Sequence, residues 1–341
     1  MSEPPGNILS ADSEFEAVEQ LHALGCTDGL PVIVPTPDRV EAMVLATGLE
    51  GDLALGEMGP ARAVASVRKV AIAAVMAGCL PDHMPVVLAA VQAVLQPEFD
   101  LGEMQGTTHC TAPLIIVNGP AREACGGVAS GFGALGPGHR ANAAIGRALR
   151  LAMINIGGAR PGTSDMALLG HGGKFGQCLG EDEAHSPFAP LHTSRGFAAE
   201  DSAVTVIGTE PPQSVAHVAG SDIERSSERL IELLAASVAG VGSNNAWLGG
   251  GQAVIVLTPD HIGELAEAGH DRSSTTAAIG ERATTRDGRP AFESADDVLL
   301  VAAGGSGLYS YVFPTWCAGA NRNRAVTRPI DIGQACAIPE R

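Results

Sequence analysis

The sequence predicts an α/β protein built from buried, mainly parallel sheets that alanine-rich helices flank. Apolar runs at 114–117, 253–257 and 297–303 each lead directly into a polar or glycine-rich turn. Such continuous apolar runs are typical of strands that are buried on both faces, as in parallel sheets. Helical patterns at 64–76 and 85–95 carry almost no charge in their middles, so we expect buried helices against those sheets.

The length of 341 residues exceeds that of an average domain, so we expect one large domain or two closely packed ones. Residues 1–12 are polar and contain a Pro-Pro-Gly sequence, which predicts a flexible tail. We expect a first α/β region over 13–200, which holds a glycine-rich loop and a central polar stretch, and a second over 201–341. Asp12 or Ser13 is the expected cap of the first helix.

The composition excludes several classes of partner. A formal net charge of −17 opposes binding to nucleic acid, whose phosphates are bound by Lys and Arg. No signal segment is present, and no run approaches the ~18 apolar residues of a membrane span, so we expect a cytoplasmic protein without membrane contact. Seven cysteines without a CxxC pair disfavour both a disulfide framework and a structural zinc site built from paired cysteines.

The central polar stretch, 142–197, holds most of the candidate catalytic residues. It opens as a helix over 142–155, which Gly157, Gly158 and Pro161 end. The run that follows carries nearly every catalytic type of side chain, which predicts a functional site. The alternative is a surface loop whose charges are merely solvated. The candidates in this run are Asp165, His171, Lys174, Cys178, Glu181, Asp182, Glu183, His185, His192 and Arg195.

A glycine-rich loop, 125–140, leads into the helix at 142–155. Backbone N–H groups before a helix amino terminus can bind an anion, and Arg140 and Asn142 would strengthen such a site. The loop lacks both the Gly-Lys-Ser/Thr ending of a Walker loop and the usual Rossmann spacing. The sequence therefore indicates a phosphate or carboxylate site without identifying a nucleotide.

Polar residues also border the strand at 114–117. Thr108, His109 and Cys110 precede it, and Asn118 follows it. Ligands gather at the carboxyl ends of parallel strands, which favours Asn118. We keep His109 and Cys110 as candidates because a plain turn needs no such concentration of hydrogen-bonding and nucleophilic groups. The alternative for them is a capped turn with an inert thiol.

Motifs spread over residues 25–330 carry a resemblance to a known family. They lie at 26–32, 76–81, 107–109, 115–120, 135–138, 140–143, 145–150, 155–159, 173–174, 178, 181 and 190–192. Through them the chain resembles a bacterial family of unassigned enzymes. Members of that family are similar to neighbours of the UGSC proteins. The UGSC proteins are small and are named for a selenocysteine- or cysteine-Gly-Ser-Cys motif. The positions that match its motifs are His109, Asn118, Asn142, Lys174, Cys178, Glu181 and His192.

The resemblance implies thiol or selenol chemistry nearby but no settled reaction. Cys110 departs from the family pattern, in which a proline or small residue is expected, so the resemblance gives it no catalytic role. Gly176 and Gln177 also depart from the pattern, and substrate preference is expected to differ accordingly. The chain has no UGSC-like motif of its own. The implied partner is therefore a separate, small cysteine-rich protein.

We predict a thiol-dependent lyase or hydrolase that acts on a small, carboxylate-bearing metabolite. Cys178 would be the nucleophile or redox thiol, and Lys174, four residues earlier, would favour its thiolate. Glu181, His192 and His109 would serve as acid and base. The residues expected to bind the anionic substrate are Asn118, Arg140, Asn142, Arg195 and Thr108.

Two alternatives stay open at this point. The first is metal-dependent chemistry, although the sequence requires no cofactor and shows no strong zinc signature. Its transition-metal ligands would be Cys178, Glu181, His185 and His192. The second is an accessory subunit that binds a ligand or a separate redox protein through its glycine-rich face. The alanine-rich helices also suit a homo-oligomer.

Overall fold

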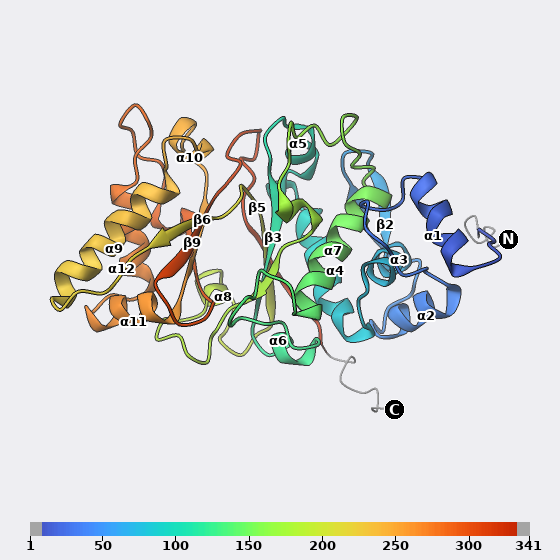
Figure 1. Ribbon diagram of the computed structural model, residues 1–341, viewed down its shortest axis with the longest axis horizontal. Coiled ribbons are helices and arrows are strands. Elements are labelled where there is room, and N and C mark those ends of the chain that lie inside the picture. The colour runs from blue at the N-terminus through green and yellow to red at the C-terminus, as the bar shows by residue number, and fades with distance from the viewer. Residues whose placement is uncertain (1–8, 333–341) are drawn as a thin grey trace.

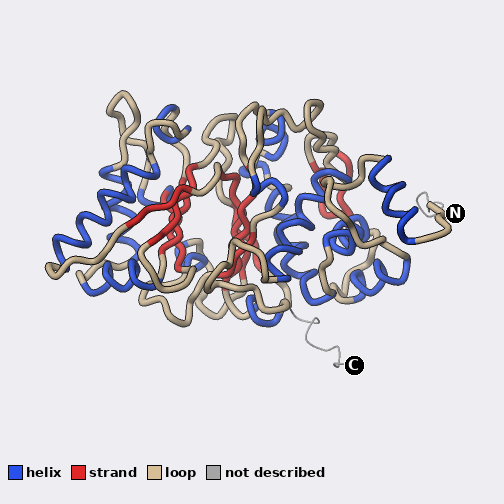
Figure 2. The backbone as a smooth tube through the Cα atoms, viewed as in Figure 1, coloured by secondary structure: helices blue, strands red, loops and turns tan. Residues whose placement is uncertain are grey.

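The computed structural model describes residues 9–332, which form four layers. Two four-stranded sheets stand at the centre, and helices cover the outer face of each (Figure 1, Figure 2). Apolar side chains from both sheets meet between them in one buried cluster, so the sheets pack face to face. The layers therefore follow the order helix, sheet, sheet, helix.

The first sheet has the strand order β10-β5-β3-β4. β3 (Ala112–Asn118) lies parallel to β4 (Cys178–Gly180) and antiparallel to β5 (Ala203–Thr209). β10 (Val326–Pro329) pairs with the other side of β5 and is antiparallel to it. The sheet thus contains one parallel and two antiparallel pairs.

The second sheet has the strand order β6-β9-β7-β8. β7 (Ala253–Leu257) lies parallel to β8 (Val298–Ala302) and antiparallel to β9 (Tyr309–Pro314). β6 (Gln213–Ala216) pairs with the other side of β9 and is antiparallel to it. This is the same arrangement of one parallel and two antiparallel pairs.

The two sheets share a strand pattern but exchange their fourth strands. In each sheet a parallel pair is followed by an antiparallel strand, namely β3, β4 and β5 in the first and β7, β8 and β9 in the second. β6 follows β5 in the chain yet pairs with β9, whereas β10 follows β9 yet pairs with β5. The two crossing segments meet at an isolated antiparallel bridge between Thr209 and Thr315.

Three helices cover the outer face of the first sheet: α3 (Val67–Ala77), α4 (Met84–Val94) and α7 (Arg140–Asn155). Side chains alternate along β3, as expected for a strand. Ile115 and Val117 pack against these helices, while their neighbours in the strand pack against the second sheet. Both faces of β3 are therefore buried, which explains its continuous apolar sequence.

Three helices cover the outer face of the second sheet: α9 (Ile223–Val238), α11 (Pro259–Glu267) and α12 (Arg272–Arg282). Leu230 and Leu234, one turn apart on α9, are fully buried in this layer. This spacing is typical of a helix that is apolar on one face. Both central sheets are thus shielded from solvent on their outer sides.

Shorter elements surround these layers. α1 begins after Ser13, whose side chain accepts a hydrogen bond from the N–H of Glu16, as expected for its cap. The remaining elements are α1 (Glu14–Ala23), α2 (Pro37–Leu45), β1 (Ala54–Met58), β2 (Ala63–Ser66), α5 (Leu101–Gly106), α6 (Ala121–Ala124), α8 (Leu191–Ser194), α10 (Asn244–Trp247) and the 3₁₀ helices η1 (Pro81–His83), η2 (Pro97–Phe99), η3 (Gly172–Phe175) and η4 (Ala295–Asp297).

The predicted α/β class is confirmed, but the sheets are mixed rather than mainly parallel. The expected division near residue 200 does not coincide with a division between sheets, because β5 and β10 complete the sheet that β3 begins. Residues 1–8 of the predicted tail and 333–341 of the second region lie outside the described residues. Within 9–332, no helix has the length and apolar character needed to span a membrane.

Candidate active site

Polar side chains from several segments meet near the start of β3, on the same side of the molecule as α5 (Figure 1). The loop from α5 to β3 supplies His109 and Cys110, η3 supplies Lys174, and the segment after β5 supplies Glu210. Since β5 is antiparallel to β3, its end lies beside the start of β3, where Ala112 pairs with Thr209. We define the polar cluster as Gln105, His109, Cys110, Thr111, Arg150, Asp165, His171, Lys174 and Glu210.

Lys174 is held by a buried carboxylate. Its Nζ lies 3.0 Å from Oδ1 of Asp165 and donates to the backbone oxygen of Thr111 at 3.3 Å. Arg150, on α7, donates to the other oxygen of Asp165 at 2.8 Å. Burial would raise the pKa of Asp165, but Lys174 and Arg150 outweigh it and lower that pKa below its ordinary value. Asp165 is therefore a carboxylate that fixes both cations.

His109 makes the second contact with a carboxylate in the polar cluster. Its Nε2 lies 3.3 Å from Oε1 of Glu210, and both side chains are largely shielded from solvent. A histidine whose one nitrogen faces a carboxylate has its ring orientation fixed, and its other nitrogen can act as a base. The Nδ1 atom of His109 has no hydrogen-bond partner among residues 9–332. His109 thus has the arrangement of a general base held by an acid.

Cys110 is the partly accessible thiol of this cluster. Burial, and then the charge of Glu210, raise the pKa of Cys110, while Lys174 partly opposes them. Its resting form is therefore the protonated thiol, which needs a base to become a nucleophile. His109 is adjacent to it in the chain, although no hydrogen bond joins the ring of His109 to this thiol among the described residues.

His171 extends the polar cluster toward the neighbouring loop. Its Nδ1 accepts the N–H of Gly173 at 3.1 Å, so a neutral ring carries its proton on Nε2. Burial and the charge of Lys174 lower the pKa of His171, which favours that neutral ring. Nε2 is buried and has no partner among the described residues. The backbone of Thr209 also faces this ring and partly opposes the lowering of its pKa, so His171 is a donor at the edge of the polar cluster.

Buried polar atoms without partners gather in this cluster. Gln105 and Thr111 are each 1 % exposed, yet both amide atoms of Gln105 and the hydroxyl of Thr111 make no hydrogen bond within residues 9–332. Nδ1 of His109 and Nε2 of His171 share this condition. Buried polar groups normally have partners, and exceptions often mark functional sites. Among the described residues, the start of β3 holds five such atoms and the other end holds three, at Asn118 and His192, so the start of β3 is the stronger candidate for chemistry.

Cys178, predicted as the nucleophile, does not belong to this cluster. Its side chain is 2 % exposed and packs in the core between the first sheet and its helices. Burial raises the pKa of Cys178 strongly, so the thiolate is disfavoured there. Lys174, which was expected to activate it, pairs with Asp165 instead. The prediction of a reactive, exposed Cys178 is wrong because β4 carries it into the core.

Glu181 is fully buried at the opposite end of β4, and all its contacts are structural. It pairs with Arg272 of α12 at 2.7 Å and accepts from Asn118 at 2.6 Å and from the N–H of Leu191 at 2.7 Å. Arg272 also donates to the carbonyl oxygens of Ala189 and Leu300. We call Asn118, Glu181 and Arg272 the Glu181 network. It joins the two halves of the chain and lies outside the polar cluster, and the roles of Glu181 in acid–base chemistry and of Asn118 in substrate binding stay predictions.

The remaining predicted acid–base residue and the metal hypothesis also fail. His192 is completely buried near the Glu181 network, and neither ring nitrogen has a partner among the described residues. His185 is largely exposed and contacts Asp182 at 2.9 Å. Within residues 9–332, no three His, Cys, Asp or Glu side chains converge to hold a metal ion. The proposed ligand set of Cys178, Glu181, His185 and His192 is therefore wrong.

The predicted anion-binding residues serve the fold instead. Asn142 is buried, accepts the N–H of Ala129 at 2.8 Å and donates to the carbonyl oxygen of Cys178 at 3.1 Å. Arg140 donates to the carbonyl oxygen of Gly78 at 3.0 Å. Arg195 donates to that of Ala325 at 2.8 Å. These contacts tie loops to helices and strands. Thr108, by contrast, lies exposed next to His109, at the edge of the polar cluster.

Sequence reasoning missed the role of Glu210. It was assigned to a plain turn after a strand, whereas the antiparallel pairing of β3 and β5 places it against His109. Arg150 was missed as well, because it lies in a segment whose pattern indicates an ordinary helix. One signal was present: Glu210 follows a continuous apolar strand directly, as Asn118 does.

A cavity of about 690 Å³ lies next to the polar cluster, between the two sheets. We call it the glycine-lined cavity. The segments that line it include the loops at 132–136, 171–173 and 303–308, together with residues of β4 and β9. His171 belongs to both the cavity and the cluster, and Pro211 of the cavity follows Glu210. The cavity therefore borders the candidate site.

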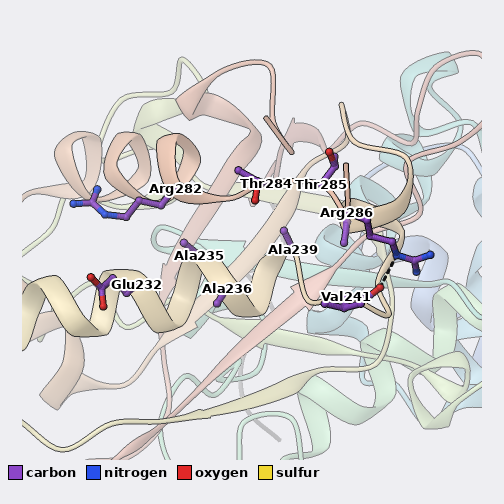
Figure 3. A pocket seen from close by; sticks show the side chains of 10 residues that line it. Glu232, Ala235, Ala236, Ala239, Val241, Arg282, Thr284, Thr285 and Arg286 are labelled. Atoms are coloured by element: carbon purple, nitrogen blue, oxygen red, sulfur yellow. Dashed lines mark hydrogen bonds between the residues drawn. The ribbon is translucent and has the colours of Figure 1, made fainter. Parts of the chain in front are cut away.

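A second hollow, of about 590 Å³, lies on the outer helical layer and is shown in Figure 3. Alanines of α9 form its floor, and Arg282 and Arg286 stand at its rim (Figure 3). Arg282 pairs with Glu228 at 2.7 Å, and Arg286 donates to the carbonyl oxygen of Val241 at 2.7 Å. Both cations are thus engaged, and none of the predicted site residues lines this hollow.

A scan against protein-family models finds no match for the chain, and a search of curated proteins finds none either.

Proposed function

We propose that the protein is a thiol-dependent hydrolase or lyase that acts on a small, carboxylate-bearing metabolite at the polar cluster. The observation that supports this most directly is the meeting of Cys110, His109, Glu210 and Lys174 at the start of β3. This proposal keeps the reaction class predicted from the sequence and moves the thiol from Cys178 to Cys110. It rests on geometry, because burial removes Cys178 from contact with solvent.

In the hydrolytic form, Nδ1 of His109 accepts the proton of the Cys110 thiol as the sulfur attacks a carbonyl carbon. A sulfur–carbon bond forms, the bond from that carbon to the leaving oxygen breaks, and His109 returns the proton to that oxygen. Water then adds to the thioester with His109 again as the base, which releases the acid and restores the thiol. Glu210 stabilises the positive ring in both halves of the reaction.

Lys174 is suited to bind the carboxylate of the substrate. An ammonium group has three donors, and contacts with Asp165 and with the carbonyl oxygen of Thr111 use two of them. The third is left for an incoming anion. Arg150 adds a second positive charge behind Asp165, so Lys174, Arg150 and Asp165 together carry one net positive charge, which Glu210 balances at the other side of the polar cluster. In a lyase, the same arrangement would hold a carboxylate while His109 removes a proton from a neighbouring carbon.

The mono-nitrophenyl ester of succinic acid tests this proposal, because it has a free carboxylate and releases a coloured product. We expect the wild-type protein to hydrolyse it and Cys110→Ala to lose that activity. Cys79→Ala is the matched control, since it removes a buried thiol that lies outside both the polar cluster and the neighbouring cavity. Alkylation by iodoacetamide followed by peptide mapping should label Cys110 in parallel with the loss of activity. Full hydrolysis by Cys110→Ala would overturn the role of this thiol.

A further inference from the structure

We propose that the glycine-lined cavity binds a flat, uncharged aromatic body of the substrate, while the carboxylate end of the same molecule lies at the polar cluster. This inference rests on the proposed function for its polar end. The substrate class is therefore an aryl-bearing carboxylate rather than a small aliphatic acid. Four features of the cavity support this inference: its uncharged lining, its aromatic side chains, its glycines and its position beside the polar cluster.

The lining of the cavity carries no formal charge. None of the described residues that line it is Asp, Glu, Lys or Arg, although charged residues make up 17 % of the chain. The charges of the polar cluster begin just beyond it, at Lys174 and Glu210. A ligand that spans both places therefore needs a neutral part and a charged end. The volume of 690 Å³ is within the ordinary range of ~300–1,000 Å³ for small-molecule sites.

Aromatic side chains are concentrated in this lining. The chain has two tyrosines, Tyr309 and Tyr311, and both line the cavity together with Phe132. Phe132 is 76 % exposed and Tyr309 is 60 % exposed, although aromatic residues make up 4 % of the sequence. Exposed aromatic faces beside a cavity can pack on a flat ligand by stacked or edge contacts. Their gathering here favours an aromatic ligand over an aliphatic one.

Glycines shape the cavity by letting neighbouring groups approach the backbone. A Cβ atom at Gly305 would overlap the ring of Phe132, so that ring lies directly on the backbone of a loop from the other half of the chain. A Cβ atom at Gly173 would likewise overlap the side chain of Gln177. Gly172, in contrast, has open space around its missing Cβ and an ordinary φ. A larger residue at 172 is therefore tolerated by the fold and fills space beside the cavity.

The cavity and the polar cluster are continuous through two segments. His171 lines the cavity, and its pKa is influenced by the charges of Lys174 and Glu210. Pro211 and Pro212 line the cavity directly after Glu210. A ligand whose ring lies among the aromatic side chains can therefore extend past His171 toward Lys174. The unpartnered Nε2 of His171 lies at this junction.

Binding of phenylpropionate and propionate to the full chain tests the inference by calorimetry. These two carboxylates differ by one ring, so the comparison isolates the contribution of the cavity. We expect phenylpropionate to bind at least about tenfold more tightly, because burial of an aromatic ring contributes well over the free energy of one tenfold step. Equal affinities, or no binding of phenylpropionate, would overturn the inference.

Substitutions in the lining locate the ring. Gly172→Leu should abolish the preference for phenylpropionate, and Tyr311→Ala should reduce it severalfold. The matched controls are Gly242→Leu, at a glycine with equally open surroundings outside the cavity, and Trp247→Ala, which removes another exposed ring. Both controls should keep the preference. Thermal unfolding checks that each variant is folded, and Tyr309→Ala replaces Gly172→Leu if the latter is not.

The variant Cys110→Ala separates this inference from the proposed function. Its side chain does not line the cavity, so binding of phenylpropionate should persist when hydrolysis is lost. Retained hydrolysis by Cys110→Ala together with a retained ring preference would refute the thiol mechanism and leave the cavity assignment intact. A preference for phenylpropionate that survives in Gly172→Leu and in both tyrosine variants would refute the cavity assignment instead.

Discussion

The polar cluster and the Glu181 network lie at opposite ends of β3 and contain similar side chains, but they differ in how many hydrogen bonds are satisfied. In the Glu181 network, the carboxylate of Glu181 is fully buried and receives Arg272, Asn118 and a backbone N–H. In the polar cluster, His109 and His171 each keep one nitrogen without a partner among the described residues. The carboxylate of Glu181 therefore has its partners, although Oδ1 of Asn118 has none among the described residues, whereas in the polar cluster the two histidines themselves have groups left for a ligand.

This difference shows that residue type does not distinguish a structural site from a reactive one. In a buried ion pair, every oxygen lone pair of the carboxylate can accept a hydrogen bond. Such a pair resists proton transfer, because the gain of a proton by the carboxylate leaves the buried cation without its counter-charge. A histidine with one nitrogen on a carboxylate and the other unengaged can gain and lose a proton. We therefore expect changes in the Glu181 network to alter stability and changes in the polar cluster to alter activity.

The largest effect is expected on catalysis, from His109→Asn. Loss of the base should lower the turnover of the nitrophenyl succinate monoester by about 10²–10⁴-fold, the range for general acid–base catalysis. The free energy of unfolding should change little, because the side chain of His109 is partly exposed. Stopped-flow kinetics and urea titration measure the two quantities. A loss of stability that accounts for the loss of turnover would contradict the assignment.

The largest effect on stability is expected from Glu181→Ala. Removal of the carboxylate leaves the guanidinium of Arg272 buried without its partner, which costs about 3–5 kcal/mol of unfolding free energy. Urea titration followed by circular dichroism gives this value. Glu210→Ala is the matched control: its carboxylate also pairs with a side chain, but it should cost much less. Equal costs for the two variants would remove the contrast between the two sites.

The pH dependence of alkylation tests the electrostatics of Cys110. Burial and Glu210 raise the pKa of this thiol, so its rate of reaction with iodoacetamide should rise at a higher pH than that of a free cysteine. Glu210→Gln removes a negative charge that disfavours the thiolate and should move the midpoint to lower pH. Lys174→Met removes an opposing positive charge and should move it to higher pH. Mass spectrometry of the labelled peptide follows each profile.

The labelling of Cys26 serves as the internal reference for these profiles, because this partly exposed thiol lies outside the polar cluster. Its profile should be the same in the wild type and both variants. A midpoint for Cys110 that shifts in the same direction in Glu210→Gln and Lys174→Met would be inconsistent with the arrangement of charges described above.

The smallest effect is expected from Cys178→Ala. This change removes one sulfur atom from the core beside β4 and should cost about 1 kcal/mol of unfolding free energy, as for loss of a methyl-sized group. Cys178 borders the glycine-lined cavity, so KM can change, but kcat per folded molecule should equal that of the wild type. A loss of turnover with unchanged stability would restore Cys178 to the mechanism and weaken the comparison between the two ends of β3.

The strands that are buried on both faces could be predicted from the sequence. The expected strand at 253–257 coincides with β7, and that at 114–117 lies within β3, because continuous apolar runs have few other places in a fold. β6 and β10 were not predicted, since each has four residues and is partly exposed. Without these two strands, the exchange between the sheets could not be predicted.

The site could be predicted in part for a similar reason. Lys174 and His109 were both predicted as site residues and both lie in the polar cluster, where each contacts a carboxylate. Cys178 was misplaced because a short strand within a polar stretch has no periodicity that would show its burial. The partner of Glu181 is Arg272, which lies 91 residues later in the chain. Local sequence patterns carry no information about such a distant ion pair.

The exchange of β6 and β10 has a consequence for synthesis of the chain. During translation, β5 has β3 on one side, but its other side has no partner until residues 326–329 have left the ribosome. An unpaired edge of this kind is a site for association with other chains. The nascent protein therefore depends on the timely emergence of β10, and chaperones that bind extended segments would have their greatest effect during this interval.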